Sequence, residues 1–214
     1  MGRADRVGRV DQPISYLALG DSYTIGTGAS DESRNYPSII ARRLEDATGR
    51  KVELTNPAVN GFTTQDLINE ELPYLRSVEP RLVSILIGVN DLVQGRAPQA
   101  YRALLNRIYD EVAGLELAAG RVVAISIPNW SVVPAARDFG GPDHLRRLTR
   151  KFNSIARGEA ESHGFRWIDI TAASTDAEDT PGWISSDRLH PGDPQYRAWA
   201  DVIWAEVKDS WAKP

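Results

Sequence analysis

Short apolar segments alternate with longer amphipathic segments along almost the whole chain of 214 residues. The apolar segments are largely β-branched and have Gly, Pro or Asn beyond them, which is typical of buried strands. Five strands are predicted, over residues 14–19, 51–55, 81–87, 121–127 and 166–168. Apolar residues at three- and four-residue spacing predict helices over residues 36–48, 64–78, 98–119, 143–163 and 194–211. The alternation indicates an α/β fold in which helices cover both faces of a five-stranded parallel sheet.

The composition fits one domain whose stability depends on its core. Hydrophobic residues make up 42% of the chain, and its length suits a single substantial core. We expect residues 13–214 to form that domain, after a flexible polar tail at residues 1–12. The chain has no cysteine, which excludes disulfides, thiolate metal ligands and thiol nucleophiles.

Charge and hydropathy narrow the range of partners. Acidic residues outnumber basic ones by 29 to 25, and the net charge of −4 argues against nucleic-acid binding. No segment approaches about 18 consecutive apolar residues, so stable membrane insertion is not expected. The polar N-terminal stretch lacks the apolar core of a signal peptide, which predicts a cytoplasmic protein, or a secreted one if a signal peptide has been removed. The oligomeric state is left open.

Polar residues follow the predicted strands at their carboxyl ends, where parallel sheets bind ligands. Ser22 follows the first strand, Asn60 and Gly61 follow the second, residues 88–91 follow the third, and residues 187–190 come after the fifth. Because the carboxyl ends of parallel strands meet at one edge of a sheet, we expect these four loops to converge there.

Ser22 is the candidate nucleophile and His190 is its candidate base. The tripeptide Gly20-Asp21-Ser22 also fits an ordinary turn, so the assignment depends on the distant residues. A serine hydroxyl attacks at neutral pH only if an imidazole takes its proton and another group orients that imidazole. Asp187, three residues before His190, meets this requirement. The other two histidines, at positions 144 and 163, lie at the ends of a predicted helix and are expected to be structural.

Acyl transfer also needs donors aimed at the oxygen that becomes negatively charged in the tetrahedral intermediate. Asn90 offers a side-chain amide, and Gly61 offers a main-chain N–H that no Cβ obstructs. Taken singly, each residue also fits a turn that ends a strand. Agreement of four loops on one chemistry favours the functional interpretation.

The ordered blocks Gly20-Asp21-Ser22, Gly61, Gly88-Val89-Asn90-Asp91 and Asp187-Arg188-Leu189-His190-Pro191 resemble those of the SGNH (GDSL-like) hydrolase superfamily. The resemblance spans nearly the whole chain and implies a three-layer α/β/α sandwich of the flavodoxin-like type. It implies that Ser22 is the nucleophile and also an oxyanion donor through its main-chain N–H, with Gly61 and Asn90 as the other donors. His190 would be the base and Asp187 its orienting partner. Tyr23 and Gln195 depart from the usual motifs without affecting these roles.

The motifs and the resemblance together predict a serine esterase that cleaves small-molecule carboxylic esters through an acyl-enzyme. The expected substrates are esters with short or medium acyl chains, lipid-like or acetylated. No metal and no organic cofactor is required for this chemistry. Carbohydrate acetylesterase, acyl-thioesterase and lysophospholipase activities stay open as alternatives, because the same site would serve them.

Five apolar residues near the strand ends are candidates for an acyl pocket: Leu92, Val93, Trp130, Phe139 and Trp183. The alternative is that the aromatic residues only pack loops onto the scaffold. The Gly- and Pro-rich segment 134–142 is predicted to be a long loop over the site.

Two other classes of function fit the sequence less well. A metal-dependent phosphoesterase would use Asp21, Asn90, Asp91, Asp187 and His190, but two-metal sites normally need several histidines. A catalytically silent binding module would have no need of all five positions of the predicted site. We therefore expect a hydrolase.

Overall fold

The computed structural model describes residues 12–177 and 179–213, so the predicted tail lies almost wholly outside the described residues. The strands are β1 (Ile14–Gly20), β2 (Val52–Thr55), β3 (Leu82–Leu86), β4 (Val122–Ile125) and β5 (Arg166–Ile168). They form one parallel sheet in the order β2-β1-β3-β4-β5. This is the strand order of flavodoxin-like folds, and it confirms the predicted fold class.

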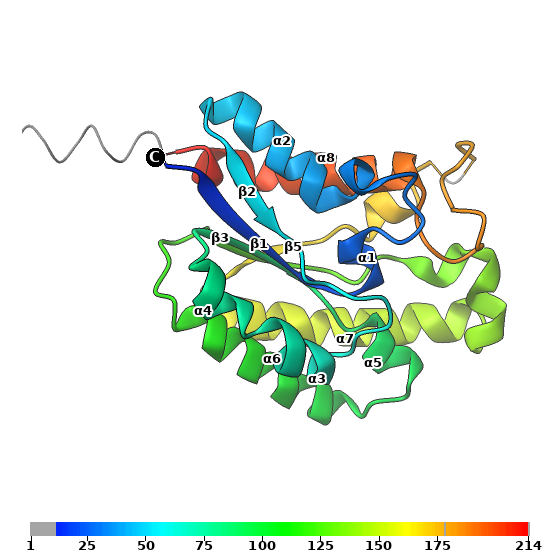
Figure 1. The fold of residues 1–214 in the computed structure, drawn as a ribbon. Coiled ribbons are helices and arrows are strands. Elements are labelled where there is room, and N and C mark those ends of the chain that lie inside the picture. Colours follow the sequence, from blue (N-terminus) through cyan, green and yellow to red (C-terminus); the bar gives the residue numbers. More distant parts are fainter. Residues whose placement is uncertain (1–11, 178, 214) are drawn as a thin grey trace, which may run out of the picture.

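Helices cover both faces of the sheet (Figure 1). One layer holds α2 (Tyr36–Thr48) and α8 (Asp193–Trp211), which pack against each other. The other layer holds α6 (Pro98–Ala113) and α7 (Pro142–Ser162), with the short α3 (Thr64–Asp66) and α4 (Tyr74–Val78) beside them. Two further short helices, α1 (Ser22–Ile25) and α5 (Val89–Val93), follow directly from β1 and β3. Within the described residues, no helix combines the length and apolar character needed to cross a membrane.

The predicted helix over residues 64–78 is divided into three pieces. A capping box between Thr63 and Asp66 starts α3, and a π-helical turn, η2 (Leu67–Glu71), follows. Leu72 donates its N–H to the carbonyl of Leu67, which is the wide π-type bond. Pro73 has no N–H and cannot continue the helix, so α4 begins after it. The result places Glu71 on an inward-facing turn.

The predicted helix over residues 98–119 ends early, at Ala113, because Gly114 follows and Glu116 has a positive φ of 51°. The segment predicted as a loop over residues 134–142 contains a short 3-10 helix, η4 (Pro134–Phe139), and another, η3 (Trp130–Val132), precedes it. Two more 3-10 turns, η1 (Glu32–Arg34) and η5 (Ala172–Ser174), both contact α8.

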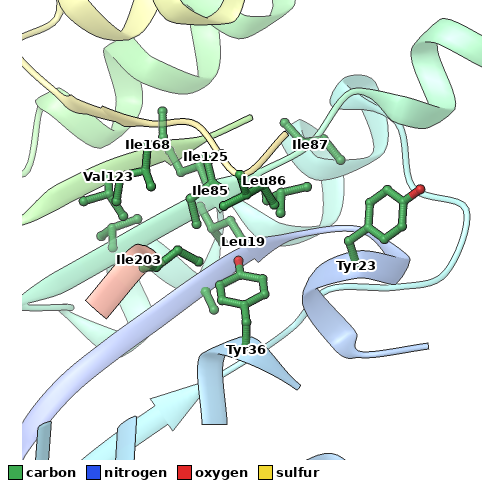
Figure 2. Close-up of a cluster of buried hydrophobic side chains, with 14 of the residues drawn as sticks. Leu19, Tyr23, Tyr36, Ile85, Leu86, Ile87, Val123, Ile125, Ile168 and Ile203 are labelled. Carbon is green, nitrogen blue, oxygen red and sulfur yellow. The ribbon is translucent and has the colours of Figure 1, made fainter. Parts of the chain in front are cut away.

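Aliphatic side chains of the sheet form the centre of the core. Figure 2 shows these side chains from β1, β3, β4 and β5 with Ile203 of α8 beside them: Leu19, Ile85, Leu86, Val123, Ile125 and Ile168. Full burial of each such side chain contributes about 1.5–3 kcal/mol. Because the carboxyl ends of β1 and β3 are buried in this core, the segments that follow them start from fixed positions.

Candidate active site

A tight turn at Asp21, between β1 and α1, positions Ser22. Asp21 caps α1, and its Oδ1 accepts the N–H of Tyr23 at 3.0 Å. The residue before Asp21 must be glycine, because a Cβ at position 20 would lie 2.1 Å from Thr24 Oγ1 and 2.3 Å from the carbonyl oxygen of Leu86. Ser22 is the first residue of α1, and the N–H groups of a first helical turn have no acceptor within the helix. The turn therefore presents a hydroxyl and a main-chain donor at one position.

The loop with Asp187 and His190 fixes the imidazole from one side. His190 Nδ1 lies 2.6 Å from Asp187 Oδ2. Asp187 Oδ1 accepts three hydrogen bonds, from the hydroxyl of Ser185 at 2.6 Å and from the N–H groups of Leu189 at 2.8 Å and His190 at 2.9 Å. This arrangement leaves His190 Nε2 as the nitrogen available to a nucleophile.

Burial raises the pKa of Asp187, but the hydrogen bonds from Ser185, His190 and Leu189 outweigh it and bring the pKa far below its ordinary value. Asp187 is therefore ionised at neutral pH. A carboxylate in this position stabilises a positive charge on the imidazole and holds it in one tautomer.

Tyr23 joins the serine turn to the histidine loop. Its ring centroid lies 6.1 Å from that of His190 and 5.6 Å from that of Trp199 in α8, with edge-on geometry in both cases. Tyr196 donates its hydroxyl to the carbonyl of Thr27 at 2.8 Å, so α8 also holds the segment after α1. Because Tyr23 follows Ser22 directly, the serine turn and the histidine loop lie at the same edge of the sheet. The hydrogen bonds among the described residues include none between the side chains of Ser22 and His190, and such contacts commonly tighten only when substrate binds.

Asn90 is bound to the loop that carries Gly61. Asn90 in α5 donates an Nδ2 hydrogen to the carbonyl of Phe62 at 2.8 Å, next to Gly61. An amide has two N–H groups, so the second is left for another acceptor. Gly61 has a φ of 88°, a left-handed conformation that favours glycine, and a Cβ built there meets nothing within 4 Å. The main chain at Gly61 is therefore open to close approach.

Asp91 is a structural anchor whose role sequence reasoning missed. Its Oδ2 accepts the N–H of Thr64 at 2.8 Å, its Oδ1 accepts the Thr64 hydroxyl at 2.7 Å, and it forms an ion pair with Arg96. The residue ties α5 to α3 and so fixes Asn90. The feature of the sequence that pointed to Asp91 is its position directly after Asn90 in Gly88-Val89-Asn90-Asp91. Asp91 and Asp187, both candidate ligands in a metal-dependent alternative, are engaged by donors of the protein itself.

The candidate pocket residues differ in accessibility. Leu92, Trp130 and Trp183 are buried, and Trp183 Nε1 donates to the carbonyl of Ser174 at 3.1 Å. Phe139 is 39% exposed and packs its ring edge-on to Trp130, with centroids 5.4 Å apart. The segment that carries it is attached to the histidine loop, because Ala135 donates its N–H to the carbonyl of Arg188 at 3.2 Å. Phe139 and the half-buried Val93 are thus the candidates within reach of a ligand.

Comparison with known proteins finds esterases among the relatives of this chain. The curated relatives include the GDSL-like esterase Rv1075c of Mycobacterium tuberculosis, which is 24% identical over 92% of this chain; the chain spans 62% of that relative's length. They also include thioesterase 1/protease 1/lysophospholipase L1 of Escherichia coli, 25% identical over 82% of this chain and 74% of the relative. Among solved structures, the acetylxylan esterase Axe2 of Geobacillus stearothermophilus has the same fold, with a TM-score of 0.71 at 20% identity, over 95% of this chain and 98% of that one.

A sequence model of the GDSL-like lipase/acylhydrolase family matches residues 18–198, which include all five positions of the predicted site. The match confirms the predicted resemblance and the predicted class, a hydrolase that acts on esters. The chain belongs to the GDSL-like lipase/acylhydrolase family.

Proposed function

We propose that this protein hydrolyses carboxylic esters by two-step acyl transfer at Ser22. The observation that carries the proposal is the imidazole of His190, held through Nδ1 by Asp187 at 2.6 Å while its other nitrogen is left for the serine turn. The ionised Asp187 supports an imidazole that gains a proton during catalysis.

In the first step, Ser22 Oγ attacks the ester carbonyl carbon while His190 Nε2 takes the hydroxyl proton. The bond between that carbon and the alcohol oxygen then breaks, and the alcohol leaves with the proton from His190. In the second step, water attacks the acyl-serine, His190 takes a proton from the water, and the acid departs as the Ser22 hydroxyl is restored.

The negative oxygen of each tetrahedral intermediate is bound by three donors: the main-chain N–H groups of Ser22 and Gly61 and the side-chain amide of Asn90. The bond from Asn90 to the carbonyl of Phe62 supports this role, because it holds the amide in one orientation before substrate arrives. Donors that are fixed in advance need no reorganisation as charge develops.

We assign short and medium acyl esters as the substrate class. Phe139 is exposed, and the segment that carries it is bound to the histidine loop, so its ring offers a limited apolar surface for an acyl chain. Val93, half-buried at the end of α5, is a second candidate contact. The names of two relatives point to other leaving groups, since one is a thioesterase and lysophospholipase and another is an acetylxylan esterase. Acyl thioesters, lysophospholipids and acetylated sugars are therefore the competing substrates in the test.

The test is a panel of p-nitrophenyl esters of increasing acyl length, run beside an acyl thioester, a lysophospholipid and an acetylated xylo-oligosaccharide. Wild-type protein should hydrolyse the shorter esters, and a fluorophosphonate should label Ser22. Ser22→Ala and His190→Ala should lose nearly all hydrolysis, whereas His144→Ala, which changes an exposed histidine outside the site, should retain it. Full activity in Ser22→Ala would exclude the mechanism.

A further inference from the structure

Glu71 is a buried carboxyl group that lies against the serine turn but has no part in the mechanism above. It belongs to the π-helical turn η2, and the residue is fully buried. Its Oε2 accepts the N–H of Gly20 at 2.9 Å. Gly20 is the last residue of β1 and stands two positions before Ser22. The contact therefore connects the second crossover of the sheet to the segment that carries the nucleophile.

Asp21 holds the same turn from its other end. It is also fully buried, and its Oδ1 accepts the N–H of Tyr23. The other oxygens of both groups, Asp21 Oδ2 and Glu71 Oε1, are buried without a hydrogen-bond partner among the described residues. Two carboxyl groups thus hold the main chain around Ser22, and each uses only one oxygen.

An ionised carboxylate in a buried site normally requires a cation or several hydrogen-bond donors. Among the described residues, neither Asp21 nor Glu71 forms an ion pair, and Arg96 is paired with Asp91, a residue whose charge acts on Asp21. The titratable groups that interact electrostatically with the pair from the surrounding helices are acidic: Tyr23, Tyr36, Asp91, Tyr101 and Tyr196. Burial without positive charge favours a neutral carboxyl group.

The electrostatics agree with this geometry. Burial raises the pKa of Glu71 to about 8, the Gly20 N–H opposes the rise, and the charge of Asp21 adds to it. Burial raises the pKa of Asp21 to about 7, with a smaller opposing effect of the Tyr23 N–H and a further increase from the charge of Asp91. Each group makes ionisation of the other less favourable.

We propose that Glu71 is a positioning residue of the nucleophile and that it acts as a neutral carboxyl group, accepting the Gly20 N–H while a proton occupies its other oxygen. The proposal rests on the proposed role of Ser22. When Glu71 loses its proton while Asp21 is ionised, two like charges repel each other in a buried region. Their repulsion is relieved by entry of water or by movement of Glu71 away from Gly20. Either change releases the turn that aims Ser22, so kcat falls while substrate binding is largely kept.

The kinetic test compares Glu71→Gln, Glu71→Leu and wild type, with Glu70→Gln as an exposed control from the same turn. Gln keeps a neutral acceptor for the Gly20 N–H, whereas Leu removes it. Wild-type kcat should fall as the pH rises past about 8, with KM changed less than about twofold. Glu71→Leu should lower kcat about tenfold at neutral pH, and Glu71→Gln should restore most of that loss and lack the alkaline fall. Glu70→Gln should follow wild type.

Two results would overturn the proposal. One is an alkaline fall of kcat at the same pH in Glu71→Gln as in wild type. The other is a Glu71→Leu protein that is folded, as judged by circular dichroism, and keeps wild-type kcat. If Glu71→Leu does not fold, the comparison of Glu71→Gln with wild type still decides.

A measurement that needs no turnover separates this proposal from the proposed function. The infrared carbonyl band of a protonated carboxyl group should be present in wild type at about pH 7, be absent at this position in Glu71→Gln, and titrate together with the chemical shift of the Gly20 amide. Absence of the band would exclude the neutral form. If the band is present but Ser22 is neither labelled nor required for hydrolysis, the proposed function fails and the neutral Glu71 stands.

Discussion

The side-chain amide of Asn90 donates a hydrogen bond to the main-chain carbonyl of Phe62 at 2.8 Å, and this bond joins two loops that leave different strands of the sheet. The loop after β2 carries Gly61, and α5, which follows β3, carries Asn90. Asp91 reinforces the connection through its two hydrogen bonds with Thr64. Two of the three proposed oxyanion donors are therefore fixed relative to each other without any ligand.

Replacement of Asn90 should mainly affect the chemical step. Asn90→Ala removes one proposed oxyanion donor and should lower kcat by roughly 10²–10³, with a smaller change in KM. Asn90→Asp should lower it further, because a carboxylate would then face both the Phe62 carbonyl and the developing oxyanion. Gln94→Ala, an exposed change next to the same short helix, serves as the control. Steady-state kinetics on a p-nitrophenyl ester measure these effects, and equal kcat values in Asn90→Ala and wild type would contradict the role.

Gly61→Ala tests the main-chain donor. At a φ of 88°, an added Cβ costs about 1–2 kcal/mol of backbone strain, and it would also stand where an ester must approach. We expect a drop in kcat/KM of at least about tenfold. Gly49→Ala is a matched control, because Gly49 also has a positive φ of 66° and open space around its Cβ, but it ends α2. The assignment of Gly61 as a donor is supported if both variants lose similar stability but Gly61→Ala loses much more activity than Gly49→Ala. Equal activity in the two variants would contradict it.

The sequence predicted the sheet edge well because strand ends depend on local patterns. The apolar runs before Ser22 and Asn90 end where polar residues and glycine begin, and parallel strands bring those ends together. The partners of each side chain depend instead on tertiary packing. The contact of Glu71 with Gly20 required a π-helical turn that the helical periodicity of residues 64–78 does not reveal.

The pocket residues show the same limit. Trp183 and Phe139 are both aromatic residues in segments near the predicted site, so the sequence alone does not distinguish a buried ring from an exposed one. In the structure, Trp183 is buried and its indole N–H is bound to the carbonyl of Ser174, whereas Phe139 is 39% exposed. Burial of this kind is decided by how loops pack on α8 and η5, which no short-range pattern encodes.

Asp187→Asn should impair catalysis more than its small change in size suggests. The oxygen of Asn can still accept the bonds from Ser185 and Leu189, but its amide nitrogen cannot accept the bond from His190 Nδ1, so the imidazole loses its orientation and its counter-charge. We expect kcat to fall by about 10²–10⁴ at neutral pH. The pKa of Asp187 is lowered in the folded chain, so the stability it provides is present above its ordinary pKa of 3.8 and is lost as the pH falls below it. Urea unfolding under acidic conditions should show a weaker acid dependence in Asp187→Asn, and an unchanged one would contradict this sign.

Phe139→Ala should change acyl preference. Removal of the exposed ring takes away apolar contact for longer acyl chains, so kcat/KM for medium-chain esters should fall about fivefold to tenfold while acetate esters are little affected. Tyr74→Ala removes an aromatic ring of similar exposure, 40%, from α4, which leads into the amino end of β3 away from the site. The acyl-length series compares the two. A uniform loss across all chain lengths in Phe139→Ala would assign this ring to loop packing alone.

Glu71→Gln should flatten the pH dependence of stability. Below pH 4.5, the ordinary pKa of this carboxyl group, folded and unfolded chains both hold its proton. Between that pH and about 8, the folded chain keeps the proton that the unfolded chain releases, so the free energy of unfolding decreases as the pH rises. The decrease is at most a few kcal/mol, since each unit of difference in pKa corresponds to about 1.4 kcal/mol. The pKa of Asp21 is likewise raised, from 3.8 to about 7, so Asp21 also lowers the free energy of unfolding as the pH rises through that interval. This contribution remains in the Glu71→Gln variant.

Glu71→Gln has no proton to lose at this position, so its stability should fall less than that of wild type across this interval, and the variant should be the more stable protein above about pH 8. Urea unfolding at a series of pH values measures both curves, with Glu70→Gln as the control for loss of one negative charge from the same turn. Parallel curves for wild type and Glu71→Gln would mean that Glu71 is ionised in the folded chain at neutral pH. In that case, the buried oxygen Oε1 must find a donor that balances its charge, and the serine turn would be held by a carboxylate rather than by a neutral acid.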